Sequence, residues 1–188
     1  MSTSNHFDNE RLLIEQCVQQ DRAAQKALYD KFAPKMYALC LRYATDQDEA
    51  KDFLQEGFIK IYKNVHSFRN EGSFEGWIRR IFVTTCTGFI QKKKHFSEIQ
   101  ESHENLPENV NGYSGLEKLS LKELQHTIQE LSAGYRTVFN LYAVEGYSHK
   151  EIADLLNISV GTSKSQYARA KQTLQKNLET KMLIKNNN

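Results

Sequence analysis

The strongest constraint on the fold lies in residues 148–171, SHKEIADLLNISVGTSKSQYARAK, which hold two helix starts and one helix stop. Ser148 and Glu151 have the S-x-x-E spacing of a capping box, in which each side chain satisfies amides of the first turn. Asn157 tolerates the left-handed conformation in which many helices end, and Ser159 is a good N-cap for a second helix. This stretch therefore predicts two helices joined by a tight turn.

The second of these helices is expected to have one buried and one cationic side. Its apolar residues recur at three- and four-residue steps, at Tyr167, Ala170, Leu174 and Leu178. Between residues 161 and 185 there are six Lys or Arg and one acid, Glu179. The outward residues are Thr162, Lys164, Ser165, Gln166, Arg169 and Lys171. This pattern fits a helix-turn-helix whose second helix enters a DNA major groove, and a helical hairpin with a solvated basic face is the alternative.

Composition limits the class of protein. The chain has 188 residues, of which 39% are hydrophobic, so it can bury one or two small cores. No stretch resembles a transmembrane run, and the N-terminus, MSTSNHFDNERLLIEQ, is not a secretory signal. We expect a soluble, cytoplasmic protein without membrane insertion.

Cysteine and histidine spacing argues against metal chemistry. Cys17, Cys40 and Cys86 are an odd number without CxxC spacing, which favours buried thiols over a disulfide framework or a zinc site. The six histidines are scattered, with no pair at ligand spacing on one helix. We expect neither a metal nor a cofactor.

Charge divides the chain into three parts. Residues 96–117 hold five acids and no Lys or Arg, together with Pro107, whereas the segments on both sides are mildly basic. The chain has only two prolines and no strand-like alternation of any length. These features predict an all-α fold, in which two small helical domains are joined by a flexible acidic linker.

The first domain is expected to present a polar patch. Asp46 and Glu49 form a plausible cap, and the apolar stripe after them consists of Ala50, Phe53, Leu54, Phe58, Ile61, Tyr62 and Val65. Beside the stripe lie Asp52, Gln55 and Glu56, at positions i, i+3 and i+4. They lack the partners needed for general acid–base or metal chemistry, so a docking surface or plain solvation is expected rather than an enzyme site.

A polar loop with aromatic residues follows, in HSFRNEGSFEGWIRRIFVTTCTGFIQKKK. From about Ser73 a helix is expected, with a second face made of Arg80, Thr84, Thr87, Gln91 and Lys94. Such a face suits phosphates and base edges, and the aromatic loop suits an unstacked base. Alternatively, Phe68, Phe74 and Trp77 are core residues, and the lysines merely close the helix at its C-terminal dipole.

Three motifs in order, DEAKDFLQEGFIKIY, SFRNEGSFEGWIRRI and GYSHKEIADLLNISVGTSKSQYARAKQTL, resemble the extracytoplasmic-function (ECF) group of bacterial RNA polymerase sigma factors. The resemblance covers most of residues 10–180. It implies a domain over 10–97 that grips the polymerase clamp and melts the minus-ten element. A linker over 98–117 follows, and then a helix-turn-helix domain over 118–182 that reads the minus-thirty-five element.

The resemblance also implies roles for residues and partners. Asp52, Gln55 and Glu56 would dock on core RNA polymerase, which is bound through its clamp and flap regions. The recognition-helix set, Thr162, Lys164, Ser165, Gln166, Arg169 and Lys171, would contact duplex promoter DNA, where acids would repel the backbone. An anti-sigma factor is a further expected partner. The melting set, which would contact single-stranded DNA and a flipped base, consists of Phe68, Arg69, Phe74, Trp77, Arg80, Thr84, Thr87, Gln91 and Lys94.

Three positions depart from the usual pattern of that family. Thr84 stands where an Asn is common, and Asn157 replaces a common Gly, which is harmless because both tolerate the left-handed conformation. Ser163 replaces a usual apolar residue, so the recognition helix is expected to seat differently or less firmly.

Two other classes of protein fit parts of the chain: a homodimeric regulator that binds duplex DNA without polymerase, and a helical adaptor that binds protein and no DNA.

Overall fold

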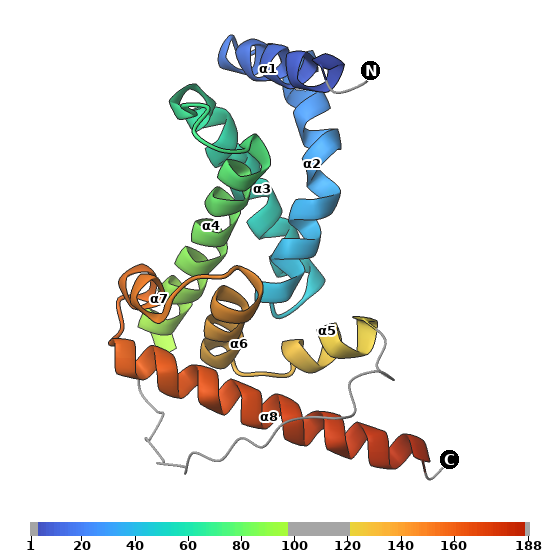
Figure 1. Cartoon of the computed structure of the whole chain (residues 1–188), viewed down its shortest axis with the longest axis vertical. Helices are drawn as coiled ribbons and strands as arrows, with labels where there is room; N and C mark the ends of the chain where they lie inside the picture. The colour runs from blue at the N-terminus through green and yellow to red at the C-terminus, as the bar shows by residue number, and fades with distance from the viewer. Residues whose placement is uncertain (1–3, 98–120, 187–188) are drawn as a thin grey trace. The chain divides into compact units, whose positions relative to one another are not determined.

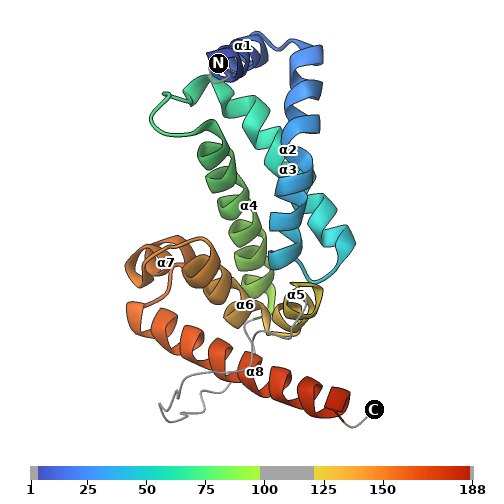
Figure 2. The ribbon, with the colours of Figure 1, turned by 45° about the vertical axis from the view of Figure 1, so that its right-hand side comes forward.

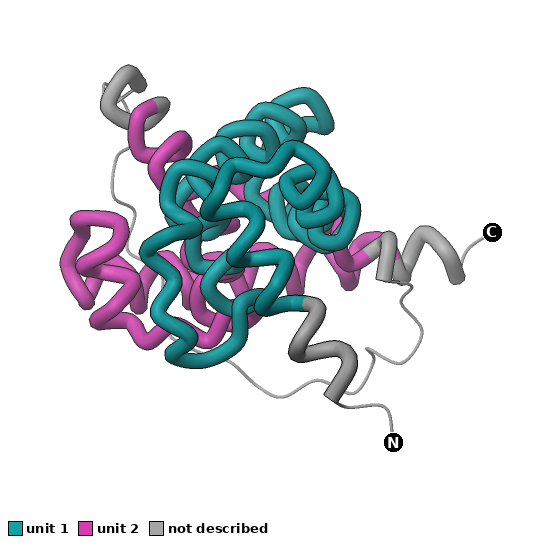
Figure 3. Tube along the Cα trace, turned by 90° about the horizontal axis from the view of Figure 1, so that it is seen from above, with its two compact units in different colours: residues 1–86 teal, residues 87–188 magenta. Residues whose placement is uncertain are grey.

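The computed structural model describes residues 4–97 and 121–186, with side chains over 10–92 and 124–181. All secondary structure in these ranges is helical, which confirms the all-α prediction. The chain divides into two compact units, residues 1–86 and 87–188, and the division falls within the fourth helix (Figure 3). The acidic linker expected over 98–117 lies outside the described residues.

The first unit consists of α1 (Ser4–Val18), α2 (Arg22–Tyr43), α3 (Gln47–Asn64) and the start of α4 (Phe74–Ser97), with a 3₁₀ turn over Val65–Ser67. Helices α2 and α3 begin where aspartates cap them, since Asp21 accepts a hydrogen bond from the amide of Ala24 and Asp46 from that of Glu49. The predicted cap at Asp46 is therefore confirmed. In Figure 1, α1 lies across the end of α2.

Apolar packing holds α2, α3 and α4 together. The predicted stripe of α3 is buried at Ala50, Phe53, Phe58 and Ile61. The ring of Phe58 meets that of Phe82 on α4 edge-on at 5.4 Å, and Phe32 on α2 meets Phe74 at 5.9 Å. A Cβ at Gly57 would lie 2.6 Å from Cζ of Phe82, so glycine allows α3 and α4 to approach this closely.

The second unit contains α5 (Leu121–Gln129), α6 (Ala133–Phe139), α7 (His149–Leu156) and α8 (Val160–Asn186), which are labelled in Figure 2. A π-helical turn over Asn140–Val144 follows α6. The capping box of Ser148 and Glu151 is present, and Asn157 ends α7 in the left-handed conformation with φ of 52°. Ser159 Oγ accepts a hydrogen bond from the Thr162 amide at 2.9 Å. The predicted helix-turn-helix boundaries are therefore confirmed.

The core of the second unit is small. Ile128 and Leu131 from the first part of the unit pack with Ala170 and Leu174 of α8. Leu124, Tyr135 and Phe139 cover this cluster. The apolar stripe predicted for α8 is thus its buried side, with Tyr167 half-buried at one end.

Candidate nucleic-acid interface

Fewer side chains of the recognition-helix set on α8 are fully exposed than the sequence predicts. Lys164 and Ser165 are exposed, whereas Thr162, Gln166, Arg169 and Lys171 are half-buried. The hydroxyl groups make local hydrogen bonds: Thr162 Oγ1 lies 2.8 Å from Ser159 Oγ, and Ser165 Oγ donates to the Thr162 carbonyl at 3.0 Å. The two most accessible side chains of the recognition-helix set therefore lie on its first two turns.

Two cations of α8 lie beside tyrosines, one at a hydroxyl group and one over a ring. Nη1 of Arg169 contacts the hydroxyl oxygen of Tyr135 at 3.4 Å, and Nζ of Lys171 lies 5.1 Å from the ring centroid of Tyr167. Arg169 is half-buried and its guanidinium lies beside the hydroxyl of a tyrosine of α6, and its contact with DNA stays a prediction. Sequence reasoning missed Tyr135, since nothing in the linear pattern pairs residues so far apart.

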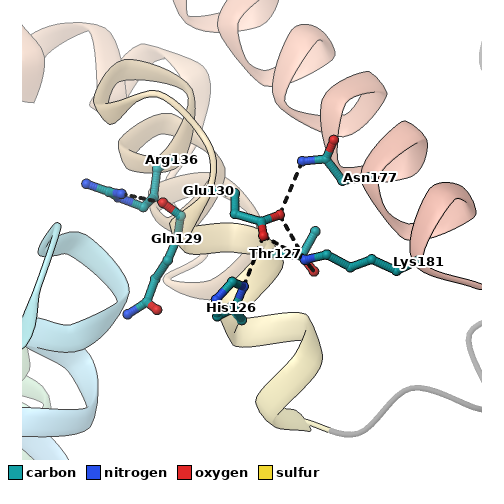
Figure 4. A network of polar contacts seen from close by, with 7 residues as sticks. All are labelled: His126, Thr127, Gln129, Glu130, Arg136, Asn177 and Lys181. Atoms are coloured by element: carbon teal, nitrogen blue, oxygen red, sulfur yellow. Dashed lines mark hydrogen bonds and ion pairs between the residues drawn. The ribbon is translucent and has the colours of Figure 1, made fainter. Parts of the chain in front are cut away.

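A polar cluster ties α8 to α5, far along α8 from the turn (Figure 4). Lys181 Nζ contacts both carboxylate oxygens of Glu130 at 2.8 Å and donates to Oγ1 of the buried Thr127 at 3.1 Å. Nδ1 of His126 lies 3.0 Å from the same carboxylate, and Asn177 reaches it at 3.5 Å. The hydrogen bond from Lys181 holds the pKa of Glu130 below its ordinary value.

The aromatic loop of the first unit forms a cluster of three rings. Phe68 lies 5.0 Å from Phe74 and 5.7 Å from Trp77, and Phe74 stacks on Trp77 at 5.6 Å. Phe74 is buried, whereas Phe68 and Trp77 are half-buried. The structure therefore corrects the expectation that Phe74 is available to a base. It is a core residue that supports the other two rings.

The second face expected on α4 is interrupted. Arg80 and Thr84 are exposed, as is Arg69 in the preceding loop, but Thr87 is buried, which corrects its expected outward position. Thr84 Oγ1 donates to the helix carbonyls of Arg80 and Ile81, at 3.1 and 2.9 Å. Gln91 is half-buried, and the side chain of Lys94 lies outside the described residues.

The polar patch of α3 is brought together as predicted. Asp52 and Gln55 are exposed and Glu56 is half-buried, one turn apart on the same helix. Oε1 of Glu56 lies 3.9 Å from Nζ of Lys60, which donates to Oγ1 of Thr85 at 3.2 Å. Glu56 thus lies close to the ammonium of Lys60, while Asp52 and Gln55 face solvent.

The prediction of buried thiols is confirmed, since Cys17, Cys40 and Cys86 are all buried and none of the three forms a disulfide. Within the described ranges, no three His, Cys, Asp or Glu side chains gather in a way that could hold a metal ion. A separate search of the same residues finds no helix with the length and apolar character needed to span a membrane.

Two family models match this chain, one in each half. Sigma-70 region 2 matches residues 28–96, and sigma-70 region 4 matches residues 121–174. The region 2 match begins within α2 and ends within α4. The region 4 match covers α5, α6, α7 and the first part of α8. The helix-turn-helix and the three-ring cluster therefore both lie within recognised parts of one family.

Comparison with curated proteins gives the same family over most of the chain. The ECF RNA polymerase sigma-E factor of Haemophilus influenzae is 30% identical over 92% of this chain and 97% of its own. The ECF sigma factor SigW of Bacillus subtilis is 33% identical over 88% and 94%. The chain belongs to the ECF group of the sigma-70 family of RNA polymerase sigma factors. It is therefore a sigma factor that directs promoter-specific initiation of transcription.

One solved structure shows the same fold. The sigma factor RpoE from Bartonella quintana, crystallised with the anti-sigma factor NepR, superposes with a TM-score of 0.51 at 22% identity. The match covers 82% of this chain and 96% of that one. Matches to both region 2 and region 4 favour a sigma factor over the homodimeric regulator and the helical adaptor.

Proposed function

We propose that this sigma factor acts in the cytoplasm, without catalysis of its own, on a restricted set of promoters. Residues 10–97 melt the minus-ten element, residues 98–117 link the domains, and residues 118–182 read the minus-thirty-five element. The observation that carries this proposal is the first part of α8, where Lys164 and Ser165 are exposed directly after the turn that follows α7. A helix presented in this way suits a major groove.

The chemistry of α8 supports a division of labour among its residues. Lys164 is an exposed ammonium that suits a phosphate, and Ser165 and Thr162 are short hydrogen-bonding residues that suit base edges or phosphates. Arg169, held at one side by Tyr135, has a preorganised guanidinium that suits bidentate contact with a base. Gln166 and Lys171 complete the proposed surface.

In the first unit, the half-buried rings of Phe68 and Trp77 are the proposed platform for an unstacked base. The exposed guanidiniums of Arg69 and Arg80 suit the phosphates of the separated strand. Thr84, Gln91 and Lys94 remain proposed contacts on α4. Removing a base from the duplex costs a few kcal/mol, which stacking and phosphate contacts must offset together with the polymerase.

We place the contact with core polymerase on the α3 patch of Asp52, Gln55 and Glu56, with a further contact between the second unit and the flap. Exposed carboxylate and amide groups on a rigid helix suit a basic partner surface. An anti-sigma factor is also a proposed partner, supported by the Bartonella structure, whose sigma factor is bound to one.

Run-off transcription tests the proposal. Purified bacterial core polymerase is given a pool of genomic promoter fragments, with and without this protein. Defined transcripts that appear only with the protein support the proposed role, and their start sites reveal both promoter elements. Tight duplex binding by the protein alone, with no transcripts, would instead favour a conventional regulator.

Two variants separate the two surfaces. Arg169→Ala should abolish promoter selection while core affinity stays unchanged, and Tyr135→Phe is the control that removes only the hydroxyl holding the guanidinium. The double change Gln55→Ala with Glu56→Ala should weaken core binding without unfolding the chain. Unchanged core affinity would rule out the α3 patch, and lost core affinity in Arg169→Ala would contradict its role in DNA reading.

Lys164→Ala measures a single phosphate contact. Each neutralised phosphate adds about one unit to the slope of log affinity against log salt concentration, so this variant should reduce the slope by about one. Lys176→Ala is a matched control, because Lys176 is also exposed on α8 but lies beyond the region 4 match. An unchanged slope in Lys164→Ala would remove it from the contact surface.

A further inference from the structure

Ser163 is completely buried in the first turn of α8, at a position where an apolar residue would close the contact with α7. A hydroxyl removed from water without a partner costs roughly 1–3 kcal/mol, so buried hydroxyls are nearly always hydrogen-bonded. Lys164 and Ser165, the two exposed residues of the proposed DNA surface, follow it directly in sequence. The way in which Ser163 is satisfied therefore bears on where these two side chains point.

The partner of Ser163 is His149, the first residue of α7. Oγ of Ser163 lies 2.9 Å from Nδ1 of His149. The hydrogen bond thus joins the starts of the two helices across the turn. Both starts are fixed independently, α7 by the capping box of Ser148 and Glu151 and α8 by Ser159.

Two tyrosines fix the orientation of the imidazole. The ring of Tyr142 stacks on His149 with centroids 4.3 Å apart and planes 15° from parallel. The ring of Tyr167 meets it edge-on at 5.9 Å. Since Tyr142 comes from the π-helical turn and Tyr167 from α8, two other segments of the second unit hold this ring of α7.

We propose that His149 and Ser163 are a matched pair of positioning residues, whose hydrogen bond sets the seat of α8 and thereby the minus-thirty-five preference. This rests on the proposed function of α8. The sequence predicted that Ser163 would make α8 pack differently or less firmly. In this proposal, α8 is instead held against α7 by a polar contact that needs both residues. Neither residue touches DNA in this account; both act through Lys164 and Ser165.

Side-chain replacements separate the hydrogen bond from the ring stack. His149→Phe keeps an aromatic ring for Tyr142 but removes Nδ1, whereas His149→Asn keeps a polar atom near the place of Nδ1 but removes the ring. Ser163→Val removes the hydroxyl and leaves Nδ1 facing a methyl group. The double change His149→Phe with Ser163→Val makes the contact wholly apolar, which can be nearly neutral for stability.

Each variant is measured as the full chain in three ways: thermal unfolding, affinity for core polymerase, and transcription in holoenzyme from promoters with every single-base change in the minus-thirty-five element. His66→Phe is the control, since it changes an exposed histidine of the first unit. We expect His149→Phe and Ser163→Val each to lower transcription about fivefold to tenfold, in proportion to a lost buried hydrogen bond, with core affinity unchanged. His149→Asn should lower transcription about twofold or less. The double variant should recover stability, while its preference for bases of the minus-thirty-five element stays altered.

The outcomes distinguish this pair from its alternatives. Independent, additive losses in the double variant would overturn the pairing. Loss of unfolding temperature with unchanged base preference in every variant would show a merely structural contact, and would overturn the positioning role. If wild-type holoenzyme shows no dependence on the minus-thirty-five bases, the proposed function of α8 fails, whereas the additivity of the unfolding temperatures still decides whether the two residues are coupled.

Discussion

The two units position their functional helices by different means. Among the described side chains of residues 1–86, Thr85 and the tyrosine Tyr43 are the buried ones that carry a polar group, and the rings of Phe58 and Phe82 pack α3 against α4. The described side chains of the second unit, residues 87–188, include six buried polar ones: Thr87, Thr127, Arg136, Thr137, Asn140 and Ser163. Its helices are joined by hydrogen bonds, such as the one at 2.9 Å from Nη1 of Arg136 to the Gln129 carbonyl.

This difference follows from the size of the two cores. Helices α2, α3 and α4 are long enough to bury aromatic rings between them, and dispersion contacts in a close-packed core fix their positions. Helices α5, α6 and α7 are short, so each offers few apolar residues, and directional polar contacts supply the remaining specificity. The first unit should therefore be sensitive to volume, and the second to hydrogen bonding and pH.

The largest expected effect tests the volume sensitivity of the first unit. Gly57→Ala places a methyl group on the buried ring of Phe82, which cannot move without separating α3 from α4. We expect a loss of about 3 kcal/mol in the free energy of unfolding. Chemical denaturation monitored by circular dichroism measures this loss.

Gly88→Ala is the matched control on α4, because a Cβ there meets nothing within 4 Å. Replacing glycine by alanine within a helix stabilises it by up to about 1 kcal/mol, so this variant should be neutral or more stable. Equal stability of Gly57→Ala and Gly88→Ala would show that α3 and α4 do not meet as closely as the structure indicates.

The next effect concerns the turn between α7 and α8. Asn157 has φ of 52°, a conformation that costs most non-glycine residues about 1–2 kcal/mol. Asn157→Ala should therefore destabilise the second unit by about 1 kcal/mol, while Asn157→Gly should change its stability by only a few tenths. Thermal unfolding of the full chain compares the two, and a larger loss for glycine than for alanine would contradict the left-handed turn.

The elements that sequence could predict are those decided by neighbours along the chain. The caps at Asp46 and Ser148 and the stop at Asn157 depend on residues three or four positions apart, and all were predictable. The apolar stripes were predictable for the same reason. The burial of Phe74 was not, because an aromatic residue at a helix start suits either a core or an open loop.

The contacts between distant helices were beyond sequence reasoning. The contact of Arg169 with Tyr135 depends on how α6 crosses α8, and the contact of Lys181 with Glu130 depends on how α5 does. Sequence spacing carries no signal for either crossing. The neighbour of Arg169 could not be predicted for this reason, since a helical wheel shows which side a residue faces and not which neighbour lies there.

A smaller effect should follow from cutting the contact between α5 and α8. Lys181→Met keeps much of the apolar stem but removes the ammonium that contacts Glu130 and Thr127. We expect a loss of about 0.5 kcal/mol, because both charged groups remain partly exposed and are screened by solvent. Thermal unfolding at low and high salt measures it, and a loss that persists undiminished at high salt would argue against an electrostatic origin.

The pH dependence of that contact has a definite sign. Folding lowers the pKa of Glu130 from 4.5. The contact with Lys181 therefore contributes to stability above that pH, and this contribution is lost as the pH falls through the lower pKa of the folded state. Wild-type protein should therefore lose more stability than Lys181→Met on acidification below pH 4.5. Parallel pH profiles for the two proteins would show that Lys181 does not set the pKa of Glu130.

The smallest expected effect is a difference in pH sensitivity between the two units at neutral to mildly acidic pH. Burial, with a smaller contribution from the charge of Lys164, lowers the pKa of His149 below its ordinary value of 6.5. The unfolded chain therefore binds a proton more readily than the folded one between these two pKa values, so stability falls as pH drops below 6.5. Among the described residues, the groups that contact the ring or shift its pKa are Lys164, Ser163, Tyr142 and Tyr167, and none of these four is acidic. His149→Phe should remove this part of the pH profile, and Lys164→Ala should shift it towards 6.5. A profile between pH 7 and 5 that is identical in wild type and His149→Phe would place the proton elsewhere and leave the second unit no more pH-sensitive than the first.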